Sequence, residues 1–221
     1  MRRPKKYRRR RIPWFVILLG IFVAVIVGGI AFYKNQQAGY NFPFPCLSEV
    51  ANYHIHPYLR IVINGENITI PAAIGIVNPQ YQNGIAVGGT CFEPLHTHDA
   101  TGIIHVESAG NTNYTLSEFF QIWNDTYHSI TLGGVNHPVV FSNTDILGFR
   151  ADSTHRIVLL VDGQPSSEYQ LLVLNTLDYC RSTGRNVPPC YPTAGGDPAY
   201  GGIAYPYGTE HTIVIEYLST A

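Results

Sequence analysis

The sequence is poor in charged side chains, and lysine is missing from most of it. Of its 221 residues only 13% are Asp, Glu, Lys or Arg, and no Lys follows Lys34. Residues 35–221 carry five Arg against all fifteen acidic residues of the chain. Because contacts to nucleic-acid phosphates need a basic surface, we expect no nucleic-acid binding by this acidic part.

Sequence motifs of several common enzyme classes are also missing. The chain has no G-x-S-x-G, Walker, H-E-x-x-H or dinucleotide-binding motif. The corresponding hydrolase and nucleotide-binding classes therefore have no support. Its only methionine is Met1, and its four cysteines form no C-x-x-C pair. A blue-copper site is disfavoured as well, since it needs a free Cys and usually an axial Met.

The basic residues gather at the start of the chain. Eight of the fourteen Lys and Arg lie in residues 1–11, and residues 12–33 follow without a charge. About 20 apolar helical residues span the ~30 Å core of a bilayer. We therefore predict that residues 1–11 form a basic cytoplasmic tail. Residues 12–33 are predicted to be a signal-anchor that crosses the cell membrane once. The alternative is a cleaved signal peptide, whose apolar core is usually shorter, about 7–15 residues.

The rest of the chain is expected to lie on the extracytoplasmic side. Residues 34–45 are polar and contain two prolines, which predicts a stalk. Residues 46–221 have a length typical of one domain. Within them, residues 181–208 are rich in Gly, Pro and Tyr and predict a long loop insertion.

The cysteines fit an exported domain, because an even number of them outside the cytoplasm usually forms disulfides. Four cysteines allow three pairings. We favour Cys46 with Cys91, which would connect the end of the stalk to the domain. The remaining pair, Cys180 with Cys190, would close a short loop.

Two hairpins and one helix can be recognised in the domain. Turn dipeptides at Asn64-Gly65 and Asp162-Gly163 each follow a β-rich run. Thr115 and Glu118 form a capping box before a helix with an aromatic face. The predicted strands are Tyr58–Ile63, Asn67–Ile70, Gly102–Glu107, Val139–Phe141, Ile157–Val161 and Thr212–Tyr217. This order predicts a β-rich α+β domain with a mostly antiparallel sheet and one packed helix, either β-grasp-like or a β-sandwich.

Histidines form the most distinctive pattern of the sequence. Two H-x-H pairs, His54 with His56 and His96 with His98, precede the strand that carries His105 and Glu107. Residues i and i+2 of a strand point to the same side, so each pair presents two imidazoles on one face. We therefore predict a metal site formed by these five histidines.

The donor types narrow the choice of metal. Imidazole and carboxylate ligands without thiolate suit Cu(II) or Zn(II). Asp99 and Glu107 are candidates for a second shell that orients the histidine rings. Asp99 could equally cap the turn that follows it.

The same residues carry a resemblance. The stretches LHTHDATGIIHVES, HIHPYLRIVINGENITIPAAIGI and YTLSEFF resemble an uncharacterised family of exported or membrane-anchored archaeal and bacterial proteins. The resemblance covers residues 52–125 and, more loosely, the final hairpin and the HTIVIEY strand. It implies a shared domain but no particular chemistry, and residues 181–208 would be an insertion relative to that family.

Three functions remain open from the sequence. The first is a membrane-anchored, extracytoplasmic domain that binds Cu(II) or Zn(II) for sensing, storage or delivery. The second is a zinc-dependent hydrolase or hydratase with His96, His98 and His105 as ligands, since three histidines and one open position form a catalytic zinc arrangement. The third is a non-catalytic accessory or surface subunit of a membrane-protein complex.

Overall fold

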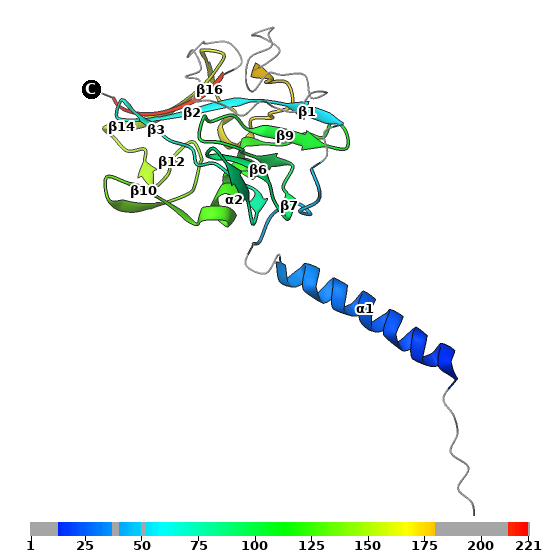
Figure 1. The fold of residues 1–221 in the computed structure, drawn as a ribbon. Helices are drawn as coiled ribbons and strands as arrows, with labels where there is room; N and C mark the ends of the chain where they lie inside the picture. The colour runs from blue at the N-terminus through cyan, green and yellow to red at the C-terminus, as the bar shows by residue number, and fades with distance from the viewer. Residues whose placement is uncertain (1–12, 37–39, 50–51, 180–211, 221) are drawn as a thin grey trace, which may run out of the picture. The chain divides into compact units, whose positions relative to one another are not determined.

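The computed structural model describes residues 13–36, 40–49, 52–179 and 212–220 (Figure 1). The chain divides into two compact units, Met1–Gly39 and Tyr40–Ala221. The predicted basic tail, the loop insertion at 181–208 and the cysteines Cys180 and Cys190 lie outside the described residues.

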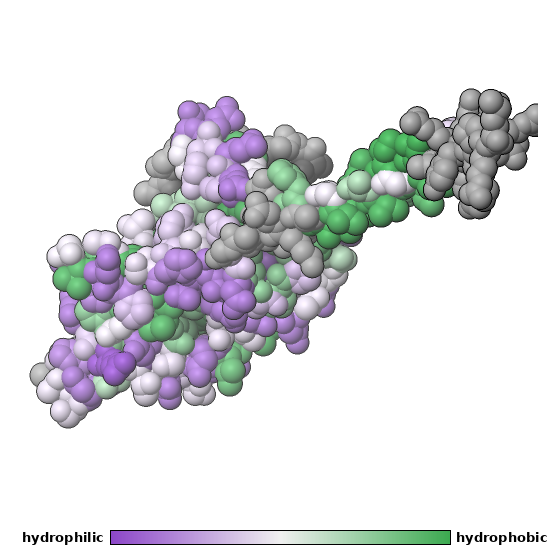
Figure 2. Space-filling model, turned by 90° about the horizontal axis from the view of Figure 1, so that it is seen from below, coloured by the Kyte–Doolittle hydropathy of each residue, from purple (hydrophilic) through white to green (hydrophobic). Residues whose placement is uncertain are grey.

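The described part of the first unit forms one helix, α1 (Trp14–Gln36). Its large apolar side chains are exposed, for example Phe22 at 63% and Val25 at 67%. Figure 2 shows this helix as mostly green, that is hydrophobic, with some paler residues between. Among the described residues, no helix combines the length and apolarity needed to cross a membrane. The transmembrane anchor at 12–33 therefore stays a prediction.

The second unit is built on a five-stranded sheet with the order β15-β14-β16-β2-β3. Neighbouring strands are antiparallel except β16 and β2, which run parallel and lie side by side (Figure 1). The bounds of the strands are β2 Tyr58–Ile63, β3 Glu66–Ile68, β14 His155–Val161, β15 Gln164–Ser166 and β16 Thr212–Ser219.

The two predicted hairpins form the outer parts of this sheet. Asn64 and Gly65 have φ values of 51° and 86°, and Asp162 and Gly163 have 52° and 74°. Positive φ at both central residues is the requirement of a type I′ turn, which Asn-Gly and Asp-Gly satisfy with little strain. The last strand, β16, lies between the two hairpins.

The predicted helix is α2 (Leu116–Tyr127), and its capping box is present. The Thr115 side chain accepts from the Glu118 amide, and the Glu118 carboxylate accepts from the Thr115 amide at 2.7 Å. The aromatic face of α2, with Phe119 and Trp123 both 0% exposed, is part of the main core together with the sheet residues Ile61 and Ile215. The β-rich, mostly antiparallel α+β fold is thus confirmed.

Shorter elements lie in the described part of the unit. They are the strand pairs β4 Ile76–Val77 with β7 Cys91–Phe92, β5 Gln80–Gln82 with β6 Ile85–Gly88, β10 Ser129–Leu132 with β11 Val135–Pro138, and β12 Asp145–Ile146 with β13 Phe149–Arg150, and the 3-10 turn η1 Tyr169–Leu171.

One predicted strand, Val139–Phe141, does not form. The preceding strand ends at Pro138, and Phe141 makes only an isolated bridge to Ile146. Val139 and Phe141 are nevertheless buried in the core. Their apolar character therefore reflects burial of a connecting segment, which an alternating pattern cannot distinguish from a short strand.

A second, three-stranded sheet has the order β1-β9-β8 and is antiparallel. Its strands are β1 (Tyr53–Ile55), β9 (His105–Ser108) and β8 (Leu95–His96). The predicted strand at Gly102–Glu107 is shorter at its start, because β9 begins only at His105. All five histidines of the predicted site lie in this sheet or directly after one of its strands.

Candidate metal centre

The central strand β9 places its side chains alternately on two faces. Ile104, just before β9, and Val106 are 0% exposed and belong to the main core. His105 and Glu107 point to the opposite face, as the alternation of a strand requires. Packing of the apolar face in the core thus fixes the position of β9, and the opposite face carries the polar groups of the candidate site.

The neighbouring strands bring the two H-x-H pairs to the same face. In the register of the sheet, His54 of β1 is opposite Glu107, and His96 of β8 is opposite His105. His56 and His98 follow their strands by one or two residues. Their ring centroids lie 4.8 and 4.4 Å from that of His105. The structure therefore brings together all five histidines that the sequence selected.

The Glu107 carboxylate lies among the histidines, where its oxygen atoms are possible metal ligands. Its Oε1 atom is 2.9 Å from His54 Nε2 and 3.3 Å from His105 Nδ1, and these two nitrogens are 3.2 Å apart. Bonds of about 2.0–2.2 Å to a tetrahedral ion place neighbouring donors roughly 3.3 Å apart. The sequence assigned Glu107 to the second shell; in the structure its carboxylate belongs, with His96, His98 and His105, to a group of side chains that could hold a metal ion.

The rings of His96 and His98 are oriented by main-chain carbonyls. His96 Nδ1 donates to the Glu93 carbonyl at 2.8 Å, and His98 Nδ1 donates to the Ala86 carbonyl at 2.5 Å. In the neutral imidazole this leaves Nε2 of each ring without a proton. The two Nε2 atoms face each other at 3.1 Å.

Burial keeps the central rings in the form that binds metals. It lowers the pKa of His96 to about 4 and that of His105 well below its usual value. Burial alone would raise the pKa of Glu107, but hydrogen bonds with His105 and His54 lower it below the usual range. The site therefore combines neutral rings at His96 and His105 with an ionised carboxylate. Within the described residues, Glu107 Oε2 is buried and has no hydrogen-bond partner.

Two acidic residues next to this group have different roles. Asp178 Oδ1 accepts from the His56 amide at 3.2 Å and lies 3.7 Å from His56 Nδ1, so it can orient that ring. Asp99 Oδ1 instead accepts from the amide and the hydroxyl of Thr101 at 2.9 and 2.5 Å, which is the turn-capping alternative. Asp178 was missed because nothing in the sequence connects it with His56, 122 residues away.

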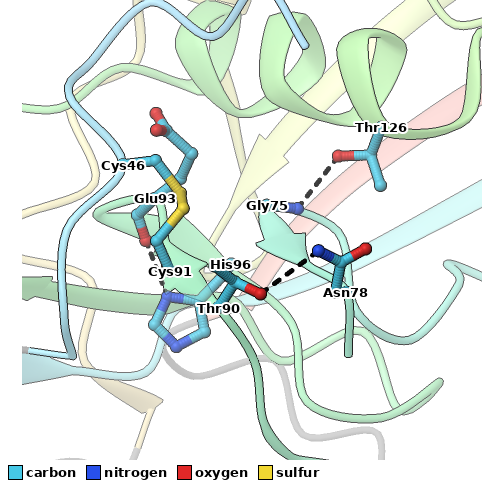
Figure 3. The surroundings of a disulfide bond; sticks show 8 residues. All are labelled: Cys46, Gly75, Asn78, Thr90, Cys91, Glu93, His96 and Thr126. Atoms are coloured by element: carbon cyan, nitrogen blue, oxygen red, sulfur yellow. Dashed lines mark hydrogen bonds between the residues drawn. A yellow bond between two sulfur atoms is a disulfide. The ribbon is translucent and has the colours of Figure 1, made fainter. Parts of the chain in front are cut away.

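The predicted disulfide between Cys46 and Cys91 is confirmed, with the Cα atoms 5.4 Å apart (Figure 3). It connects the first residues of the second unit to β7. Two residues after Cys91 comes Glu93, whose carbonyl holds the His96 ring. The disulfide thus lies two residues along the chain from the carbonyl group that orients one ring of the candidate site.

A cavity of about 260 Å³ adjoins the histidine cluster. His96 and Glu107 form part of its wall, and Phe44, Phe92 and Tyr114 supply apolar and aromatic surface. Phe44 lies in the predicted stalk, residues 34–45, and packs against the main core. The cavity gives a small molecule a route to one side of the donor group.

Glu93 also borders this cavity and is 1% exposed. Burial raises the pKa of its side chain to about 8, and the negative charge of Asp125 adds to the shift. Glu93 is therefore a neutral carboxylic acid at pH 7.

Other described histidines lie apart from the cluster. His137 Nδ1 donates to the Leu147 carbonyl and its ring stacks on Phe149. His155 is stacked on Tyr217 beside Asp152. Such packing matches the structural role that isolated histidines usually have.

Comparison with known proteins gave no relative. No family model matches the sequence, and neither a curated protein nor a solved structure is significantly similar. The resemblance of residues 52–125 to an uncharacterised family therefore stays a prediction.

Proposed function

We propose that the second unit is an extracytoplasmic metal-binding domain that holds Cu(II) or Zn(II) through its histidine cluster. The observation that carries the proposal is the contact between His96 Nε2 and His98 Nε2 at 3.1 Å. Both rings use their Nδ1 protons for main-chain carbonyls. Two lone pairs facing each other at this distance repel, unless a proton or a cation lies between them.

A metal ion is the better explanation of this contact. The pKa of His96 is lowered to about 4 by burial, so a shared proton is disfavoured at neutral pH. A cation would also neutralise the buried Glu107 carboxylate and use its unpartnered Oε2. Hydrogen bonds from the second ring nitrogen to carbonyl groups are typical of histidines that bind metals.

The donor set supports Cu(II) or Zn(II). It consists of imidazole nitrogens and a carboxylate, which suit both ions. The Cys46–Cys91 disulfide leaves no thiolate at these two positions for a softer metal. The acidic composition of residues 35–221 would in addition attract cations.

The proposal includes attachment to the cell membrane. It is supported by the uncharged residues 12–33 behind a basic start and by the exposed apolar side chains of α1. The disulfide supports an oxidising compartment outside the cytoplasm, where such bonds persist. A domain in this place could sense, store or deliver the metal.

Metal analysis of the purified full chain in detergent tests the proposal. After loading with Zn(II) or Cu(II) and dialysis, we expect a retained ion that His96→Ala and His98→Ala remove. His155→Ala is the matched control, because that ring lies outside the cluster, and it should bind as the unchanged chain does. Less than about a tenth of an ion per chain would contradict the proposal.

A zinc-dependent hydratase or hydrolase is the second candidate, favoured by the cavity that His96 and Glu107 border. A zinc ion there could lower the pKa of a bound water to about 7. Stopped-flow hydration of CO₂ by the zinc-loaded chain, with Glu107→Gln as the comparison, tests this candidate. Rates equal to those of the metal-free chain would exclude it for this substrate.

A further inference from the structure

We propose that the cluster binds two metal ions that share His105. The inference rests on the proposed function and adds the number of ions and their arrangement. It starts from the way the donor atoms separate into two groups. One group contains His96, His98, His105 and Glu107, and the other contains His54, His56 and His105.

Six side chains are more than one ion of this kind uses. Within each group the donor atoms lie within 4.8 Å of one another, and His105 is the one residue that both groups contain. Zn(II) in proteins almost always takes four ligands. The first group alone supplies four, so His54 and His56 remain as ligands for another ion.

The sheet explains why His105 is the shared residue. It lies on the central strand β9, with β1 on one side and β8 on the other. The register places His96 opposite it on β8, while His54 and His56 come from the β1 side. A neutral imidazole has one lone pair and one N–H group. If the N–H proton of His105 is released to solvent as the second ion binds, the resulting imidazolate has a lone pair on each nitrogen and can bind an ion on each side.

The ring orientations are consistent with this arrangement. His56 and His98 both stand nearly perpendicular to the His105 ring, at 87° and 70°. His105 Nδ1 is 3.2 Å from His54 Nε2, which connects it to the β1 side. His105 is 3% exposed, so water can replace few of these contacts.

Two divalent ions close together repel, and the site has carboxylates that reduce this cost. Glu107 lies between the two groups, since its Oε1 is 2.9 Å from His54 Nε2 and 3.9 Å from His96 Nε2. On the β8 side, Glu49 Oε1 lies 3.8 Å from His98 Nε2. On the other side, Asp178 Oδ1 lies 3.7 Å from His56 Nδ1. Each group therefore has a negative charge of its own next to a histidine.

The two ions would differ in their coordination. The first group offers three nitrogens and one oxygen, a full tetrahedral set. The second group offers three nitrogens and leaves one position for water or another small ligand, which is the arrangement of reactive zinc sites.

Equilibrium dialysis of the full chain against Zn(II), followed by metal analysis, gives the number of ions. We expect two per chain in the unchanged protein and in the control His155→Ala. The double variants H54A/H56A and H96A/H98A should each retain one. Circular dichroism of each variant checks that it is folded.

Sharing of His105 is tested separately with Cu(II). Two copper ions on one imidazole couple magnetically, so the integrated paramagnetic resonance signal should be clearly smaller than the copper content. This measurement uses the unchanged chain and does not depend on the folding of a variant. A signal equal to two isolated ions would overturn the shared ligand.

The outcomes also separate this inference from the proposed function. If the unchanged chain binds one ion and both double variants lose it, the cluster has a single site. This result would overturn the inference but would leave the proposed metal binding intact. If the unchanged chain retains no metal, both proposals fail.

Discussion

At the scale of the residue, ring orientation is the property on which the candidate site depends. His96 and His98 direct Nε2 inward because main-chain carbonyls accept from Nδ1. His56 has Asp178 in the corresponding position at 3.7 Å. These three partners lie outside the donor group, but they select the tautomer that can bind a metal.

We expect Asp178→Asn to weaken Zn(II) binding by about tenfold or more, because partners that orient ligating histidines typically contribute a factor of about 10–100. Competition with a chromophoric zinc chelator measures the change. The control is Asp152→Asn, which alters the carboxylate beside His155, outside the cluster. An unchanged affinity in Asp178→Asn would show that this carboxylate does not orient His56.

Glu93 gives a prediction about pH. The folded pKa of its side chain is raised from 4.5 to about 8 by burial. Between these values the unfolded chain loses the proton and the folded chain keeps it. The contribution of Glu93 to the stability of the fold therefore decreases as pH rises from about 4.5 to 8, by up to a few kcal/mol.

Glu93→Gln removes this titration while keeping the size of the side chain. As the pH rises from 5 to 8, the unfolding free energy of the variant should increase relative to that of the unchanged chain. Urea unfolding of the metal-free proteins at both pH values measures it, with the exposed Glu66→Gln as the control. A difference that does not depend on pH would mean that Glu93 ionises normally.

At the scale of the element, the candidate site depends on three short strands and the connections between them. β8 has only two residues and β1 has three. Pairs this short contribute little stability by themselves. The Cys46–Cys91 disulfide and the packing of Ile104 and Val106 in the core hold this sheet in place.

Replacing both cysteines, C46A/C91A, should lower the unfolding free energy by about 4 kcal/mol, since the bond closes a long loop. The closed segment spans a separation of 45 residues. Metal affinity should fall as well, because β7 leads to the Glu93 carbonyl that orients His96. Chemical unfolding and chelator competition measure the two effects. A loss of stability with unchanged affinity would separate the disulfide from the metal site.

At the scale of the whole molecule, the two units have opposite surface properties. α1 exposes apolar side chains along its length, whereas the second unit buries its apolar residues in a core of sheet and helix. The first unit suits a hydrophobic surrounding and the second suits water.

We expect the full chain to remain with membranes after extraction at alkaline pH, because transfer of the apolar residues of α1 into water raises the free energy. A chain that begins at Tyr40 should be released into the supernatant, and its capacity for metal should be unchanged. Fractionation followed by immunoblotting measures both. Release of the full chain would contradict the predicted anchor.

Local sequence determines several features of this protein. Asn64-Gly65 and Asp162-Gly163 specify turns through their positive φ, and Thr115 with Glu118 specifies the start of α2. The spacing of His54 with His56 and of His96 with His98 places each pair on one side of the chain. These features depend on neighbouring residues, so a single sequence reveals them.

Only the tertiary structure decided how the local features combine. Burial of Ile104 and Val106 in the core directs His105 and Glu107 to the opposite face of β9. The order β1-β9-β8 then brings together two histidine pairs that are about 40 residues apart in sequence, with His105 between them. The Glu107 carboxylate joins the group of possible metal ligands, and Asp178 becomes a partner of His56. Both contacts depend on strand order and burial, which the whole chain determines and which the spacing of residues in the sequence does not reveal.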